Sequence, residues 1–424
     1  MFLHRFARSE QRPRNADLSV STALNVNPPR QILTKPIPSD SNPLDQSEES
    51  QTVSWHRGDA HELTRGLSEK EQACNRLLDE FVDTCRGQRL NWTTHVKFVR
   101  CLGAGGQGVV YLCERPGADG FTLPVALKFF SPERFRSLEQ YDQSMQRISF
   151  VAAQIARIQH ENLLVVQNMI DRNRIRIMVM EFVEGFDLRA LVGSDTLQTT
   201  SRGLPLEQQK YLERVLFTQG PAQPRFKAGV AMAIIRDCLT ALAALHREQI
   251  VHGDIKPANI MLRRSGHAKI IDIGSAFHLD NPPQDLNCTP EYAALEVLLG
   301  EGQTALSDLA SLGYVLIELL SGQRLATSST GLGELVALKR ELPQKLHLIL
   351  PEEVRRNDLL MGFIHSMISP DPTRRFPDAD AANLYEHGAA AFHRQLIKSD
   401  LSSEYDNDIR VLINEILEQQ RISV

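Results

Sequence analysis

The run His252–Asn259 (HGDIKPAN), followed by Ile271–Gly274 (IDIG), constrains this chain more than any other stretch. The two runs contain two acids, a lysine and an amide at spacings that suit a phosphoryl-transfer site: Asp254, Lys256, Asn259 and Asp272. In such a site one acid orients a substrate hydroxyl, while the second acid and the amide hold a divalent cation against phosphate groups. The pattern therefore requires a fold that brings both runs together.

Length and charge exclude some classes of partner. The chain has 424 residues, 42% of them hydrophobic, which is enough for one large or two moderate domains. Its 47 basic and 52 acidic residues leave a formal net charge of −5, so electrostatics give no case for nucleic acid as a partner. No apolar run approaches the ~18 residues that a membrane span needs. We therefore expect neither a nucleic-acid nor a membrane partner.

The cysteines indicate a reducing compartment. They are scattered, with no CxxC pair and no His-rich neighbour, so neither a disulfide framework nor a zinc site is predicted. We expect the protein to be cytoplasmic. The six residues are Cys74, Cys85, Cys101, Cys113, Cys238 and Cys288.

The N-terminal part divides into a tail and a helix. Residues 1–60 are rich in Pro, Ser, Asn, Gln and Asp without sustained periodicity, which predicts a disordered tail. Residues 61–95 form a helical extension, in which Ser68 and Glu71 make a capping box and Gly87 supplies a stop. Apolar residues recur at helical spacing between Ala73 and Cys85, so we expect the helix to pack on the next domain rather than to bind a partner.

Further along the chain, strands come first and helices follow. Residues 96–130 alternate like strands, and a helix is expected over 137–158. The remaining strands are expected at Leu163–Asn168 and Ile175–Glu181, and the helices at Ala228–His246, Leu309–Leu320 and Asp358–Ile368. The fold class is therefore α+β, with a small β-rich lobe before a larger helical lobe.

Two helical segments fall outside this layout. A helix at Leu206–Phe217 lies in an insert that spans residues 195–226, whose role the sequence does not reveal. Residues 391–424 form a C-terminal extension with an amphipathic helix around Ile409–Leu417. We expect this last helix to dock on the domain, because two or three turns make a poor coiled coil.

Two further motifs belong to the β-rich part. Gly103–Val110 fits G-x-G-x-x-G-x-V, where missing side chains let backbone amides approach phosphates. Strand rather than helix follows it, which argues against a dinucleotide fingerprint. Val125–Lys128 (VALK) then predicts a strand that ends in an inward-facing lysine. Taken alone, either motif is also compatible with an ordinary glycine turn and a strand-end lysine.

Together these motifs resemble the eukaryotic-type serine/threonine protein kinases over residues 96–390. The resemblance implies a bilobal fold with an N-lobe at 96–183 and a C-lobe at 184–390. It also implies ATP and Mg²⁺ as cofactors and a protein as the substrate. Lysine two residues after Asp254 is the serine/threonine pattern, whereas tyrosine kinases usually differ there.

The resemblance also assigns roles to individual residues. Asp254 steers the proton of the attacking hydroxyl, Lys256 neutralises the transferring phosphate, and Lys128 holds the α- and β-phosphates. Asn259 and Asp272 are the expected Mg²⁺ ligands. The other nucleotide contacts come from the glycine-rich loop, the adenine pocket and the hinge: Leu102, Gly103, Gly105, Gly108, Val110, Ala126, Glu181, Val183, Asp187 and Met261.

Structural roles follow from the same resemblance. Thr289 is expected to bond the catalytic acid and lysine, and Asp308 to hold the catalytic loop from beneath. Glu296 and Arg375 match a buried ion pair that holds the activation segment. Leu295 stands where proline is usual, which is a mild departure.

A more serious departure concerns the glutamate that normally pairs with Lys128. The expected position holds Val151, and Gln154 lies one turn later on the same helix face, where it could bond Lys128 instead. An acid from the N-terminal helix around Asp79–Asp83 is another possibility. The missing Lys–Glu pair leaves open a pseudokinase that binds nucleotide and signals by partner binding. A kinase of small molecules is a weaker alternative.

Gly253 generates a testable prediction, because many kinases have arginine there to pair with a phosphorylated activation segment. Without that cation, we expect no activation by phosphorylation of the segment. Acidic substitutions at Ser275 and Thr289 should therefore not raise the rate of phosphate transfer, and Thr289→Asp is expected to inactivate. Clear activation by either substitution would contradict this interpretation.

Overall fold

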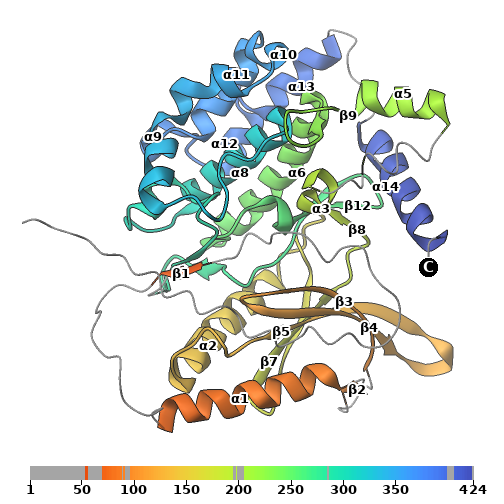
Figure 1. Ribbon diagram of the computed structural model, residues 1–424, viewed down its shortest axis with the longest axis vertical. Coiled ribbons are helices and arrows are strands. Elements are labelled where there is room, and N and C mark those ends of the chain that lie inside the picture. Colours follow the sequence, from red (N-terminus) through yellow and green to blue (C-terminus); the bar gives the residue numbers. More distant parts are fainter. Residues whose placement is uncertain are drawn as a thin grey trace, which may run out of the picture. The chain divides into compact units, whose positions relative to one another are not determined.

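A computed structural model gives the fold and describes residues 53–55, 69–87, 89–90, 96–193, 197, 205–283, 286–398 and 405–422. The sheet of the N-lobe is antiparallel, with strand order β2-β3-β4-β5-β7-β6 (Figure 1). Its strands are β2 (Arg89–Leu90), β3 (Val96–Gly105), β4 (Gly108–Pro116), β5 (Thr122–Phe130), β6 (Val166–Arg172) and β7 (Ile175–Glu181). A short 3₁₀ helix, η1 (Ala118–Gly120), joins β4 to β5. The predicted strand region at 96–130 is confirmed.

Two helices pack on this sheet, α1 (Glu69–Arg86) and α2 (Leu138–Ile155). Leu77, Phe81 and Cys85 of α1 are buried, and α1 contacts α2 and β7, so the prediction that this helix docks is confirmed. Ser68, the predicted cap, lies outside the described residues. At α2, Ser137 accepts a hydrogen bond from the backbone N–H of Gln140 at 3.3 Å and caps the helix as an N-cap serine should.

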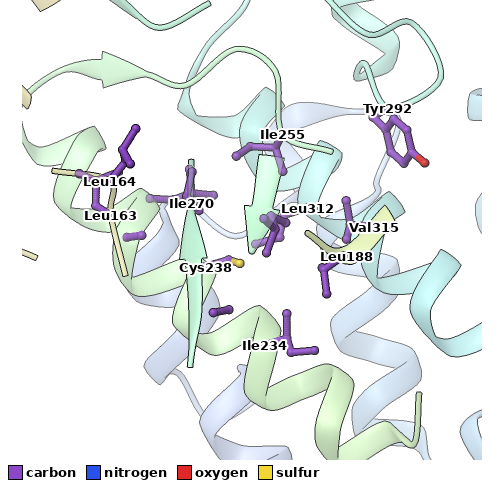
Figure 2. Packing of buried hydrophobic residues seen from close by; sticks show 14 of the residues in the cluster. Leu163, Leu164, Leu188, Ile234, Cys238, Ile255, Ile270, Tyr292, Leu312 and Val315 are labelled. Atoms are coloured by element: carbon purple, nitrogen blue, oxygen red, sulfur yellow. The ribbon is translucent and has the colours of Figure 1, made fainter. Parts of the chain in front are cut away.

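The C-lobe is helical around the buried pair α6 (Ala228–Arg247) and α8 (Ala305–Ser321). By length and mean hydropathy α6 could cross a membrane, but 72% of its most apolar window is buried, as in a core helix. Figure 2 shows Ile234 and Cys238 of α6 near Leu312 and Val315 of α8. The other helices are α3 (Leu188–Gly193), α5 (Leu206–Val215), η2 (Pro257–Asn259), α7 (Leu295–Leu298), α9 (Leu332–Ile349), α10 (Glu352–Arg355), α11 (Asp358–Met367), η3 (Pro372–Arg374), α12 (Ala379–Leu384), α13 (Ala389–Lys398) and α14 (Tyr405–Ile422).

Small sheets position the loops of the C-lobe. The strands pair as β8-β12-β13, β9-β10, β11-β14 and β1-β15. Their bounds are β1 (Val53–Trp55), β8 (Gly185–Asp187), β9 (Phe217–Thr218), β10 (Arg225–Phe226), β11 (Ile250–Val251), β12 (Ile260–Arg263), β13 (Ala268–Ile270), β14 (Phe277–His278) and β15 (Leu286–Cys288).

Two sequence predictions need correction. The strand expected at Leu163–Asn168 runs over Val166–Arg172 instead, because the backbone before it bonds the C-lobe: Leu164 N–H donates to Ile270 O at 2.9 Å. The tail predicted to be disordered over 1–60 includes β1, which pairs with β15. A three-residue strand with a partner so distant in sequence leaves no periodic signal. The rest of that tail lies outside the described residues.

The insert and the C-terminal helix pack on each other. The predicted helix at Leu206–Phe217 is confirmed as α5, although it ends at Val215 because the chain enters the β9–β10 hairpin. Tyr211 of α5 donates to Asp408 of α14 at 2.7 Å. Apolar residues of α14 are buried against α5, α6, β8 and β12. The prediction that this helix docks on the domain is therefore confirmed.

The buried pair Glu296–Arg375 generates a stability prediction. Arg375 donates from both terminal nitrogens to the two carboxylate oxygens at 2.6 and 2.7 Å, and its side chain is fully buried. We expect Arg375→Met to lower the free energy of unfolding by about 3–5 kcal/mol, because Glu296 keeps a buried, unpaired charge. Denaturation in urea measures this loss.

The neighbouring arginine offers a matched control. The side chain of Arg374 is 80% exposed, so Arg374→Met should change stability by no more than about 0.5 kcal/mol. Equal effects of the two substitutions would show that the buried pair has no special importance.

Candidate active site

The loop His252–Asn259 is held by one buried carboxylate. Asp308 of α8 accepts hydrogen bonds from the backbone N–H groups of His252 (2.8 Å) and Gly253 (2.9 Å), as predicted. Gly253 has φ +80°, and a Cβ there would lie 3.0 Å from the carbonyl oxygen of Ser275. Glycine fits this position because other residues rarely adopt such a φ. The loop therefore turns sharply just before Asp254.

Asp254, Lys256 and Thr289 form a buried cluster. The hydroxyl of Thr289 donates to Asp254 Oδ1 at 2.7 Å and accepts from Lys256 Nζ at 2.8 Å. The backbone N–H of Thr289 also donates to Asp254 Oδ1 at 2.9 Å, and Lys256 Nζ lies 3.0 Å from Asp254 Oδ2. The predicted contact of Thr289 with the acid and the lysine is confirmed. Because its side chain is buried and bonded, Thr289 is poorly placed to be phosphorylated.

Asn259 and Asp272 are brought together by the backbone, since Ile271 N–H donates to Asn259 O at 2.8 Å. The amide nitrogen of Asn259 donates to the carbonyl oxygen of Asp254 at 2.7 Å, which leaves its amide oxygen on the opposite side of that planar group. Asp272 has φ +59°, a conformation that is rare for residues other than glycine and tends to occur at functional sites.

The charge of Asp272 is stabilised within the site. Burial acts to raise the pKa of its carboxyl, but the Lys128 ammonium and the Gly274 N–H outweigh burial and lower the pKa to about 2. Asp272 is therefore ionised at neutral pH, as a cation ligand must be. Burial also lowers the pKa of Lys128, while Asp272 opposes that shift.

Lys128 has partners that the sequence did not predict. Its ammonium pairs with Asp272 and donates to Gln107 Oε1 at 2.7 Å, and Gln107 Nε2 donates to Ser275 Oγ at 2.9 Å. The suggested partner Gln154 is wrong, because its carbonyl oxygen is buried without a hydrogen bond. Among the acids of α1 whose side chains the structure describes, none bonds Lys128 either. Gln107 was missed because it occupies a variable position of the glycine motif, where no spacing rule applies.

The glycine-rich loop is a β3–β4 hairpin with two kinds of glycine. A Cβ at Gly103 or Gly105 would meet no atom within 4 Å, so that side of the loop is open to a ligand. Gly108 has φ +139°, and a Cβ there would lie 1.8 Å from Phe129 O. Glycine at 108 is thus required by the packing of β4 on β5, whatever it contributes to phosphate binding.

The predicted adenine pocket and hinge lie at adjoining strands. Val110 pairs with Lys128 and Ala126 with Met180 in the main sheet, while Met261 pairs with Asp187 between β12 and β8. Leu102 and Val183 are half-buried beside the core.

The hinge acids already have protein partners. Glu181 pairs with Lys269 at 2.5 Å and accepts from Val165 N–H at 2.7 Å, while its own backbone N–H donates to Val165 O at 3.0 Å. Asp187 accepts from Ala190 N–H at 2.8 Å and caps α3. Burial raises the pKa of Asp187, and hydrogen bonds from Ala190 and Arg189 oppose that rise. Its predicted ribose contact stays a prediction.

Comparison with known proteins agrees with this geometry. Residues 96–387 match the family model of the protein kinase domain. The chain is 32% identical over 265 residues to the serine/threonine-protein kinase Pkn1 of Myxococcus xanthus, covering 60% of this chain and 33% of that one. It is 30% identical over 306 residues to the serine/threonine-protein kinase PknJ of Mycobacterium tuberculosis, covering 69% and 44%.

A third relative is the serine/threonine-protein kinase PrkC of Bacillus subtilis, 28% identical over 231 residues, covering 54% of this chain and 30% of that one. The chain thus spans about a third to a half of the length of the curated relatives it matches. The family model covers more than half of the chain, and it coincides with the lobes that build the site. The chain belongs to the protein kinase family.

Proposed function

We propose that this protein is a serine/threonine protein kinase that transfers the γ-phosphate of ATP, with Mg²⁺, to a hydroxyl of a protein substrate. The observation that carries the proposal is the buried cluster of Asp254, Lys256 and Thr289. It presents a carboxylate and an ammonium side by side next to the activation segment. We also place the protein in the cytoplasm, a proposal that the six free cysteines support.

Asp254 and Lys256 have different roles in the transfer step. The carboxylate of Asp254 orients the substrate hydroxyl and accepts its proton as the oxygen attacks phosphorus. The ammonium of Lys256 offsets the charge that develops on the transferring phosphoryl group. Thr289 keeps both groups in place through its hydroxyl, so its role is one of positioning.

The residues present fit a magnesium ion. Asp272 is ionised and Asn259 turns an amide oxygen away from Asp254, and oxygen atoms are the ligands that Mg²⁺ prefers. Among the described residues no cluster of three or more His, Cys, Asp or Glu forms a metal site. That accords with a cation held by one or two protein oxygens, with phosphate and water completing its shell. When bound, the ion offsets negative charge on the phosphate oxygens.

Lys128 supplies the phosphate contact from the N-lobe. Its ammonium is buried and shared between Asp272 and Gln107, so phosphate oxygens would compete with Gln107 for it. This arrangement retains an oriented lysine without the usual helix glutamate. It supports a working kinase rather than a pseudokinase.

The first test is labelled phosphate transfer from Mg·ATP to the protein itself and to a generic basic substrate. We expect transfer by the wild type and none by Asp272→Asn, because the amide loses the charge that pairs with Lys128 and holds the cation. Asp119→Asn is the matched control, since this exposed turn residue has φ +54° and asparagine tolerates such a φ. It should transfer phosphate like the wild type.

Failure of the wild type to transfer phosphate would overturn the proposal. If Mg·ATP still raised its melting temperature, a nucleotide-binding pseudokinase would be the better account. Transfer that persisted in Asp272→Asn would show instead that Asp272 is not the metal ligand.

Thr289 provides a second prediction with a conservative control. Thr289→Val removes the hydroxyl at nearly constant volume and leaves Asp254 and Lys256 each short of a buried hydrogen bond. The cost of about 1–3 kcal/mol should lower kcat roughly 5- to 150-fold, with little change in the KM for ATP. Thr289→Ser keeps the hydroxyl and should retain most activity. If Thr289→Val transferred phosphate as fast as the wild type, Thr289 would have no positioning role in this site.

A further inference from the structure

Helix α9 has a lysine on its buried face. The buried residues of α9 are Leu335, Lys339, Leu342 and Leu346, whose spacing of three and four residues places them on one side of the helix. Lys339 is fully buried, like the leucines around it. Lysine is almost never fully buried unless other groups compensate for the water that it loses. The contacts of Lys339 therefore indicate what this lysine does.

The side-chain nitrogen of Lys339 contacts a backbone carbonyl and an aromatic ring. Lys339 Nζ donates to the carbonyl oxygen of Glu291 at 2.6 Å and lies 3.2 Å from the centroid of the Tyr314 ring in α8. Burial lowers the pKa of Lys339 well below its ordinary value, and the charge of Glu291 opposes that shift. Charged or neutral, the nitrogen carries a proton that it can donate. The hydrogen bond to Glu291 therefore does not depend on the charge of the lysine.

Glu291 lies in a turn that begins at Thr289. The backbone N–H groups of Tyr292 and Ala293 both donate to Thr289 O at 3.0 Å and close this turn. Within the described residues, Lys339 is the one donor to the Glu291 carbonyl. Leaving a buried acceptor without a donor is unfavourable, so the turn would shift if the lysine nitrogen were removed.

The same turn borders the place where a substrate peptide would approach. Thr289 donates to Asp254 Oδ1, so a peptide whose hydroxyl reaches Asp254 passes beside the turn. Glu291 and Tyr292 line a surface pocket there, together with residues of α3 and of the loop after α8. The hydrogen bond from Lys339 therefore holds one wall of this pocket from the core side.

We infer that Lys339 is a positioning residue for the peptide substrate, because its hydrogen bond sets the turn at Glu291 and with it the pocket beside Asp254. This inference rests on the proposed kinase activity. Lys339 is fully buried, so it acts through the turn and touches neither peptide nor nucleotide. None of the predicted nucleotide contacts lies in α9 or in the turn. The KM for a peptide should therefore depend on Lys339, while the KM for ATP should not.

Lys339→Met tests this inference, because methionine suits a helix and has a similar length but cannot donate a hydrogen bond. We expect the KM for a generic basic peptide to rise at least about tenfold, which corresponds to about 1.4 kcal/mol, while the KM for ATP changes less than about twofold. The melting temperature should not fall, since an apolar side chain often replaces a buried charged group without loss of stability. Steady-state kinetics and thermal unfolding of the full chain measure these quantities.

The matched control is Lys345→Met on the same helix. The side chain of Lys345 is 56% exposed and pairs with Glu341, so this substitution should leave both KM values and the melting temperature unchanged. An unchanged peptide KM in Lys339→Met would overturn the inference, and so would equal rises in the two KM values. A loss of activity that accompanies a lower melting temperature would also overturn it, since the role of Lys339 would then be structural alone.

The hold on the turn is tested without catalysis, by hydrogen exchange at the amides of Tyr292 and Ala293. We expect these amides to exchange at least about tenfold faster in Lys339→Met, again about 1.4 kcal/mol, and at the wild-type rate in Lys345→Met. Equal exchange in all three proteins would overturn the inference and leave the proposed kinase activity standing. If the wild type transfers phosphate to no peptide, the kinase proposal and the peptide role of Lys339 both fail, whereas exchange still shows whether Lys339 holds the turn.

Discussion

Asp308 is the residue on which the rest of the site depends. The residue is 1% exposed. Its carboxylate accepts from two backbone N–H groups of the loop His252–Asn259 and bonds His246 of α6 at 3.0 Å. A buried carboxylate is costly unless such partners compensate for lost water, so the loop, α6 and α8 must come together for the charge to be tolerated. Asp254 follows the two bonded residues directly. The position of Asp254 is therefore set by helix packing rather than by the loop alone.

The parts of the site that could be predicted from the sequence are those that lie within short runs of chain. Asp254, Lys256 and Asn259 are fixed by one loop, and their mutual contacts follow once that loop is placed. The contact of Gln107 with Lys128 and the pairing of β1 with β15 could not be predicted, because each joins segments whose separation in sequence carries no periodic signal. Helix ends were predicted to within a few residues where the apolar periodicity extends over many residues, as in α6. The C-terminal end of α5 was not predicted, because it is set by the β9–β10 hairpin that follows.

The missing glutamate changes how Lys128 is held. Burying an ammonium without an acid partner is unfavourable, and Val151 of α2 cannot supply one. Asp272 provides the charge instead, so one carboxylate serves both the lysine and the proposed cation. Gln107 adds a neutral oxygen from the glycine-rich loop, which links the position of that loop to the lysine. Phosphate that displaces Gln107 from the lysine would also break this link to the loop, a coupling that a helix glutamate would not impose.

The activation segment over Leu286–Glu296 is held at several points without a phosphate. Thr289 bonds Asp254, Arg375 pairs with Glu296, and the buried ammonium of Lys339 donates to a carbonyl of the segment at 2.6 Å. These contacts fix the end of the segment that meets Asp254, and they need no arginine at position 253. Strand β15 continues directly from that fixed end. Strand β1 pairs antiparallel with β15, so main-chain pairing also holds the part of the segment just before Thr289.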